Sequence, residues 1–185
     1  MTLVLSGTSG VALDSIKNSL MFLETAKATT SGTSIDFTGI PSWAKKITVL
    51  FNGVSLNGTA NYLIQIGSGS VETTGYVSTS IITTNAASSA GTNSTSGFLV
   101  YGANAANVVT GHMILTLVGS NLWIGSHSGL VNTTTIVGGG GNKTASSTID
   151  RIRLTTSNGT DTFDNGSVNI LIEGYVYWQM QQKKF

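Results

Sequence analysis

The stretch 46-KITVLFNG-53 decides the fold class, because its residues alternate strictly between two faces. Ile47, Val49 and Phe51 share one face, and the other face is more polar. A repeat of two residues is typical of a β-strand with one face against a hydrophobic core. The stretch therefore predicts a strand in a sheet that covers such a core.

Turn signals separate this strand from further strand-like stretches. Asn57-Gly58 follows it and favours a tight hairpin, and a second hairpin is expected around Gly119-Ser120. The other strand-like stretches recur at spacings near ten residues: Asn61–Gly67, Thr74–Thr84, Phe98–Gly102, Gly111–Gly119, Asn121–Gly129, Thr133–Gly141 (which ends in a glycine run), Ile149–Thr156 and Ser167–Trp178. This spacing predicts an all-β, antiparallel β-sandwich of jelly-roll-like form.

The single proline of the chain stands just before the first strand, in 39-GIPSWAKKITV-49. Pro41 fixes its own φ, biases Ile40 toward extended geometry and cannot donate to a sheet ladder. We interpret the stretch as a corner between two strands, with Trp43 at one edge of the core, rather than as a binding loop or a basic patch.

The N-terminal part of the chain predicts a short attachment arm over residues 1–20, ahead of a β-sandwich domain over residues 21–185. The segment Val11–Glu24 fits a short helix and an extended arm equally well. A strand is expected to begin near Met21 or Phe22.

Three apolar residues near the start, Leu3, Val4 and Leu5, are the candidate assembly residues of this arm. An extended apolar segment can add a strand to the exposed sheet edge of a neighbouring protein. We expect no cleaved export signal, because the apolar run stops after Leu5 and has no basic leader.

The composition narrows the function classes. Charged residues make up 9% of the chain, against about 25% in an average soluble domain. The net charge of +1 gives no electrostatic footprint for nucleic acid. No cysteine is present, which excludes disulfides and thiolate zinc sites, and no stretch has the length of a membrane span. A surface with so little charge is typical of permanent assemblies.

The two histidines, His112 and His127, are interpreted as surface or strand-end polar residues. A catalytic histidine needs a nucleophile or carboxylate held nearby, and the abundance of serine makes any Ser–His match uninformative. We therefore expect no enzyme activity, no cofactor and no metal.

Two glycine- or aspartate-rich stretches are interpreted structurally. The run Gly138–Thr144 departs from the phosphate-loop pattern and is expected to form a bulged or sharply turning loop. Asp161 and Asp164 lie in a stretch that fits an Asx-rich turn between strands, and whether they bind a cation stays open.

Four stretches, in order, carry a resemblance to a known family. They are SIDFTGIPSWAKKITVLFNGVSLNG (Ser34–Gly58), YLIQIGSGSVETTGYVS (Tyr62–Ser78), GHMILTLVGSNLWIGSHSG (Gly111–Gly129) and GGGNKTASSTIDRIRLTTSNGTDTFDNGSVNILIEG (Gly139–Gly174). Together they cover most of the region from Met21 to Tyr177. The chain resembles bacteriophage tail-fibre and related virion-fibre proteins.

The resemblance implies a β-sandwich structural protein, made in the host cytoplasm and exposed on the virion, usually as a homotrimer beside other virion proteins. The expected function is that of a tail-fibre or short-fibre subunit contributing to host-surface recognition. The hydroxyl- and amide-rich loop Asn85–Gly97 is a candidate contact for a host surface glycan or protein. The alternative is a capsid decoration or cement protein that stabilises the head. No catalytic residues carry over from the resemblance.

Overall fold

The computed structural model describes residues 21–86 and 88–174, and these residues form two antiparallel β-sheets without a helix. The larger sheet has nine strands: β1 (Met21–Leu23), β14 (Phe163–Gly174), β4 (Ala44–Leu56), β10 (Val109–Gly119), β11 (Leu122–Val131), β12 (Thr135–Thr144), β7 (Tyr76–Thr84) and β8 (Ser89–Ser94) in that order, with β2 (Lys27–Ala28) also paired to β14. The smaller sheet has five strands: β3 (Ser34–Thr38), β13 (Arg151–Thr156), β5 (Tyr62–Ser68) and β6 (Ser70–Val71), with β9 (Phe98–Val100) paired to β5.

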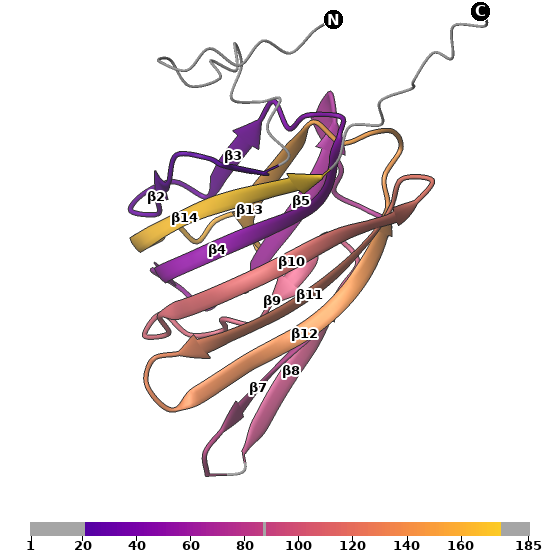
Figure 1. The fold of residues 1–185 in the computed structure, drawn as a ribbon. Helices are drawn as coiled ribbons and strands as arrows, with labels where there is room; N and C mark the ends of the chain where they lie inside the picture. The colour runs from indigo at the N-terminus through magenta and orange to yellow at the C-terminus, as the bar shows by residue number, and fades with distance from the viewer. Residues whose placement is uncertain (1–20, 87, 175–185) are drawn as a thin grey trace, which may run out of the picture.

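The two sheets pack face to face around one core, as the all-β sandwich prediction requires. Figure 1 shows the strands of the larger sheet across the front and β13, β5 and β9 behind them. Ile47, Val49 and Phe51 of β4 are buried, and the residues between them are half-buried. The predicted alternation of this strand is confirmed. The finer jelly-roll-like connectivity stays a prediction.

The hairpin predicted at Asn57-Gly58 is wrong, because β4 and β5 belong to different sheets. Both edges of β4 are already occupied, one by β14 and the other by β10. The Asn57-Gly58 turn instead carries the chain across the sandwich, where the Asn57 side chain accepts a hydrogen bond of 2.8 Å from the Thr162 N–H. The signal for a reversal was correct, but the partner strand depends on contacts far away in the sequence.

The corner predicted at Pro41 and the hairpin predicted near Gly119 are both confirmed. Pro41 lies between β3 of the smaller sheet and β4 of the larger one, and its carbonyl accepts a hydrogen bond of 2.9 Å from the Ala44 N–H. Gly39, with φ of 77°, supplies the turn before it. Ser120 and Asn121 join β10 to β11, with φ of 47° and 63°. Positive φ at both central residues is the type I′ hairpin geometry.

Two expected loops are strands. The glycine run Gly138–Gly141 lies inside β12, paired on one side with β11 and on the other with β7. The stretch Asn85–Gly97, expected as a loop, contains the edge strand β8 paired with β7. Glycine and small polar residues have a low β-propensity by themselves. Backbone hydrogen bonds to β7 stabilise these two segments as strands even though their side chains do not favour it.

The proposed arm over residues 1–20, with Leu3, Val4 and Leu5, lies outside the described residues. The strand expected from Met21 is present as β1, and β2 follows after a short interruption. Within the described ranges there is no helix of the length and apolar character that a membrane span requires.

Candidate functional site

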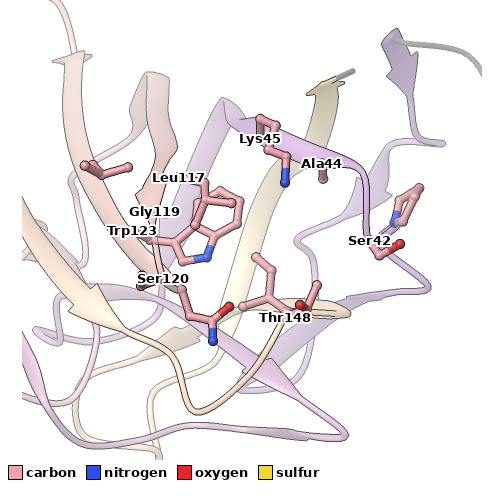
Figure 2. Close-up of a pocket in the computed structure, with 12 residues that line it drawn as sticks. Ser42, Ala44, Lys45, Leu117, Gly119, Ser120, Trp123 and Thr148 are labelled. Atoms are coloured by element: carbon pink, nitrogen blue, oxygen red, sulfur yellow. The ribbon is translucent and has the colours of Figure 1, made fainter. Parts of the chain in front are cut away.

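A pocket of about 320 Å³ opens at one end of the sandwich, where three segments from different parts of the sequence meet. They are the corner before β4, the turn between β10 and β11, and the connection from β12 to β13 (Figure 2). β4, β10, β11 and β12 are neighbouring antiparallel strands, so the connections on this side lie together at one end of these strands.

Backbone hydrogen bonds tie the turn between β10 and β11 and the corner before β4 to the connection from β12 to β13. The Asn121 carbonyl accepts a hydrogen bond of 3.0 Å from the Ala145 N–H, which ties the hairpin to the chain leaving β12. The corner is tied to the same connection, because the Ile40 N–H donates to the Asp150 carbonyl at 3.0 Å. These backbone hydrogen bonds fix the positions of the three segments relative to one another.

The pocket combines an apolar floor with a polar rim that includes one ammonium group, that of Lys45. Buried Trp123, Ala44 and Ile149 form the floor, and Figure 2 shows the Trp123 indole beside Leu117 with its nitrogen on the side of Thr148. The remaining lining residues bring hydroxyl, amide, apolar and one ammonium group: Pro41, Ser42, Leu117, Val118, Gly119, Ser120, Asn121, Thr148 and Lys45. None of the described residues that line the pocket carries a carboxylate. A concave apolar site with a few polar groups is the usual form of a small-ligand site.

The sequence interpretation placed the corner at Pro41 correctly but missed its position at a pocket. Ser120, Asn121 and Thr148 carried no signal as site residues, because a single polar residue in a turn is normal in this composition. Their convergence depends on strand order, and the hairpin prediction near Gly119 was the one clue to which end of the strands they share.

His127 is buried, and its interpretation as a surface or strand-end residue is wrong. Its Nε2 shares a hydrogen bond of 2.8 Å with Ser80 Oγ, and Ser80 is fully buried. Burial lowers the pKa of the His127 imidazole to about 4, with a smaller contribution from the charge of His112. The Nδ1 atom of His127 is buried without a hydrogen-bond partner among the described residues. The pair lacks a carboxylate at Nδ1 and access for a substrate, so its arrangement suits packing rather than acyl transfer.

An ion pair joins the buried Lys143 to the half-buried Glu72, with 2.7 Å between Nζ and Oε2. Glu72 also accepts hydrogen bonds from the Ser146 N–H at 2.9 Å and the Ser146 hydroxyl at 2.7 Å. Burial tends to raise the pKa of the Glu72 carboxyl, but the bonds from Lys143 and Ser146 outweigh burial and lower it. The Lys143 ammonium also lies 5.3 Å from the centre of the Tyr76 ring.

Asp161 and Asp164 point to different partners. Asp161 accepts a hydrogen bond of 2.8 Å from the Ala60 N–H, and Asp164 accepts one from the Ser55 hydroxyl. Asn158 Oδ1 accepts hydrogen bonds from the N–H groups of Thr160 and Asp161, each at 3.0 Å, which confirms an Asx turn here, whereas Asp164 lies within β14 and outside the turn. Among the described residues, no group of three or more histidine, cysteine, aspartate or glutamate side chains has the arrangement of a metal site.

In comparisons with known proteins, no family model, no curated protein and no solved structure matches this chain. The resemblance to virion-fibre proteins therefore stays a prediction.

Proposed function

We propose that the protein is a structural subunit of a bacteriophage virion, of the tail-fibre or short-fibre kind, and that it contributes to host-surface recognition by binding a saccharide. The observation that carries the binding part of this proposal is the end pocket. The proposed location of the protein on a virion rests on the sequence resemblance alone.

The chemistry of the pocket fits a saccharide better than a strongly charged ligand. Saccharide hydroxyls donate and accept hydrogen bonds, and the rim offers the hydroxyls of Ser42, Ser120 and Thr148 with the amide of Asn121. The apolar floor around Trp123 and Leu117 suits the C–H faces of a sugar ring. A volume of about 320 Å³ is at the small end of ligand pockets, which fits one sugar unit of a longer chain.

A direct test is binding of the purified protein to host cells and to an array of host-surface saccharides. Asn121→Gly removes the rim amide and preserves the turn, because glycine adopts φ of 63° without strain. Thr148→Trp fills the pocket from an exposed position. Both variants are expected to lose at least tenfold in affinity and to unfold close to the wild-type temperature.

Asn132→Gly is the matched control. Asn132 also has a positive φ, 56°, but it lies in the turn between β11 and β12, at the opposite end of β11 from the pocket. This variant should bind as wild type does. Wild-type protein that binds no host cell or saccharide, or pocket variants that bind normally, would contradict the proposed site.

The location on the particle needs its own measurement. Antibody labelling of intact virions, viewed by electron microscopy, is expected at the tail. Labelling over the head would instead support the alternative, a capsid decoration protein.

A further inference from the structure

The two adjacent lysines of β4, Lys45 and Lys46, lie in different surroundings. Lys46 is paired in the sheet with Glu173 of β14, and its ammonium lies 2.8 Å from the Glu173 carboxylate. Lys45 lines the end pocket, and Figure 2 shows its ammonium end directed into the pocket, toward the side of Thr148. Of this pair, it is therefore Lys45 that brings its charge to the pocket.

An irregularity in β4 explains the direction of the Lys45 side chain. Lys46 and Ala44 are paired with consecutive residues of β14, although Lys45 lies between them. Lys45 is therefore the extra residue of a β-bulge, which takes a side chain out of the regular alternation of a strand. Burial shows the same break, because Ala44 and Ile47 are three residues apart and both are buried. Bulges that redirect a side chain are over-represented beside active sites.

The corner before the bulge supplies a second donor close to Lys45 in the chain. The Pro41 carbonyl accepts a hydrogen bond of 2.9 Å from the Ala44 N–H, which closes a turn. Ser42 is an exposed residue of this turn, and it also lines the pocket. A carboxylate has two acceptor oxygens, so it can accept hydrogen bonds from the Ser42 hydroxyl and the Lys45 ammonium together.

The charge of the pocket limits the kind of acidic group that it suits. Lys45 carries the formal charge among the described lining residues, whose other polar side chains end in hydroxyl and amide groups. One ammonium balances the single negative charge of a carboxylate, whereas a phosphate monoester carries about −1.5 to −2 at neutral pH. Phosphate sites often add arginine side chains or the N–H groups of a helix N-terminus. The described lining residues include no arginine and no helix.

We infer that the saccharide bound in the end pocket is acidic, and that the Lys45 ammonium pairs with the carboxylate of one sugar unit. The inference rests on the proposed function, because it specifies the ligand of the same pocket. The floor around Trp123 receives the ring, the rim binds its hydroxyls, and Lys45 selects a ring with a carboxylate over one with a neutral hydroxymethyl group. Hydrogen bonds between charged groups are about twice as strong as neutral ones, so this contact determines specificity.

The test compares two forms of the same ligands. Host-surface saccharides are arrayed unmodified and after reduction of their carboxyl groups to hydroxymethyl groups with carbodiimide and borohydride, which removes the charge and keeps the rings. The wild-type protein is expected to bind the carboxylate form at least about tenfold more tightly than the reduced form. Added salt should narrow the difference, because it screens charges that solvent can reach.

Substitutions at the two lysines assign the preference to one side chain. Lys45→Gln should lose about tenfold in affinity for the carboxylate form and bind the reduced form as the wild type does. Lys45→Arg keeps the charge and should keep the preference. Lys46→Gln is the matched control, because it removes the same charge from the next residue, which is paired with Glu173. It should bind as the wild type does, and thermal unfolding should show that all three variants are folded.

The outcomes separate this inference from the proposed function. Equal binding of the two forms by the wild type, or an unchanged preference in Lys45→Gln, would overturn the inference. If Asn121→Gly still lost binding in that case, the pocket would bind a neutral saccharide and the proposed function would stand. A preference for phosphorylated saccharides over the carboxylate form would also overturn the inference. Binding of neither form would overturn the inference and the proposed function together.

Discussion

His127 of β11 and Ser80 of β7 share a hydrogen bond of 2.8 Å across β12, the strand that lies between β11 and β7. Gly139 of β12 is paired with His127 on one side and with Ser80 on the other. A Cβ atom at Gly139 would lie 2.6 Å from the His127 Cε1 atom. The absence of a side chain at position 139 therefore allows β11 and β7 to bond across β12.

Acid should destabilise the fold through His127. Its pKa is about 4 in the folded protein, below the ordinary value of 6.5, so between these values the unfolded chain binds a proton that the folded protein does not. The stabilisation is complete above pH 6.5 and is lost as the pH falls toward 4. The free energy of unfolding should fall by about 2 kcal/mol between about pH 6.5 and about pH 5, at about 1.4 kcal/mol per pH unit. Urea titrations at several pH values measure it.

The slope of the unfolding free energy against pH identifies His127 as the responsible group, even in a variant whose overall stability is lower. His127→Gln should remove most of the pH dependence in this window, whereas His112→Gln on the exposed face should keep it. Asp36 and Glu72 have lowered pKa values, with ordinary values of 3.8 and 4.5, and they add their own acid sensitivity only at lower pH. An unchanged slope in His127→Gln would show that another group is responsible.

Adjacent glycines in β12 should respond oppositely to the same substitution. Gly139→Ala should destabilise the protein by about 1–3 kcal/mol, because the new methyl group overlaps the Thr79 carbonyl and the His127 ring. Gly138→Ala should be neutral or stabilising by up to about 1 kcal/mol, since the site is open and glycine is a poor strand residue. Thermal and urea unfolding of the two variants side by side give the comparison. Equal losses of stability in both would refute this account of the strand.

Removing the Glu72 carboxylate from the Lys143–Glu72 pair should lower the free energy of unfolding more than removing the Lys143 ammonium does. The Lys143 side chain is 8% exposed and that of Glu72 is 18% exposed, so Glu72→Gln leaves the more deeply buried charge unpaired. We expect a loss of about 3 kcal/mol for Glu72→Gln. Lys143→Met should cost less, because methionine keeps the apolar stem and Ser146 still bonds Glu72. Urea unfolding at neutral pH measures both, and the reverse order would contradict the assigned burial.

The turn at Asn57-Gly58 gives a coupled test with Asp161. A Cβ atom on Gly58 would lie 2.2 Å from Asp161 Oδ2, so Gly58→Ala must displace this carboxylate from its bond to the Ala60 N–H. We expect a loss of about 1 kcal/mol in the wild type. In an Asp161→Ala background the same substitution should cost close to nothing. A double-mutant cycle without coupling would show that the two residues act independently.

Much of the fold was predictable because its signals are local. The alternation of Ile47, Val49 and Phe51 specified a strand with one buried face, and the pattern depends on no distant contact. Pro41 and the turn near Gly119 likewise gave correct chain reversals. The pairing of β4 was not predictable, because the Asn57-Gly58 signal says that the chain turns and not which strand lies beside it.

The candidate site was less predictable than the fold. Asn121 and Thr148 are ordinary polar residues in connections, and only the order of the strands brings them to one pocket with Trp123. His127 was misjudged for a similar reason. It lies on the same face of β11 as the buried Trp123, and Gly139 on the next strand leaves room for its ring, a contact that its own neighbours in the sequence do not reveal.

The sequence by itself determined an all-β chain with little charge and with strands separated by turns, because side-chain periodicity and turn chemistry act over a few residues. Only the tertiary structure decided which sheet each strand joined, that Gly138–Gly141 form part of β12, and that three connections surround a pocket. These outcomes depend on pairings between residues far apart in the chain. Backbone hydrogen bonding and close packing select such pairings among partners that look locally equivalent.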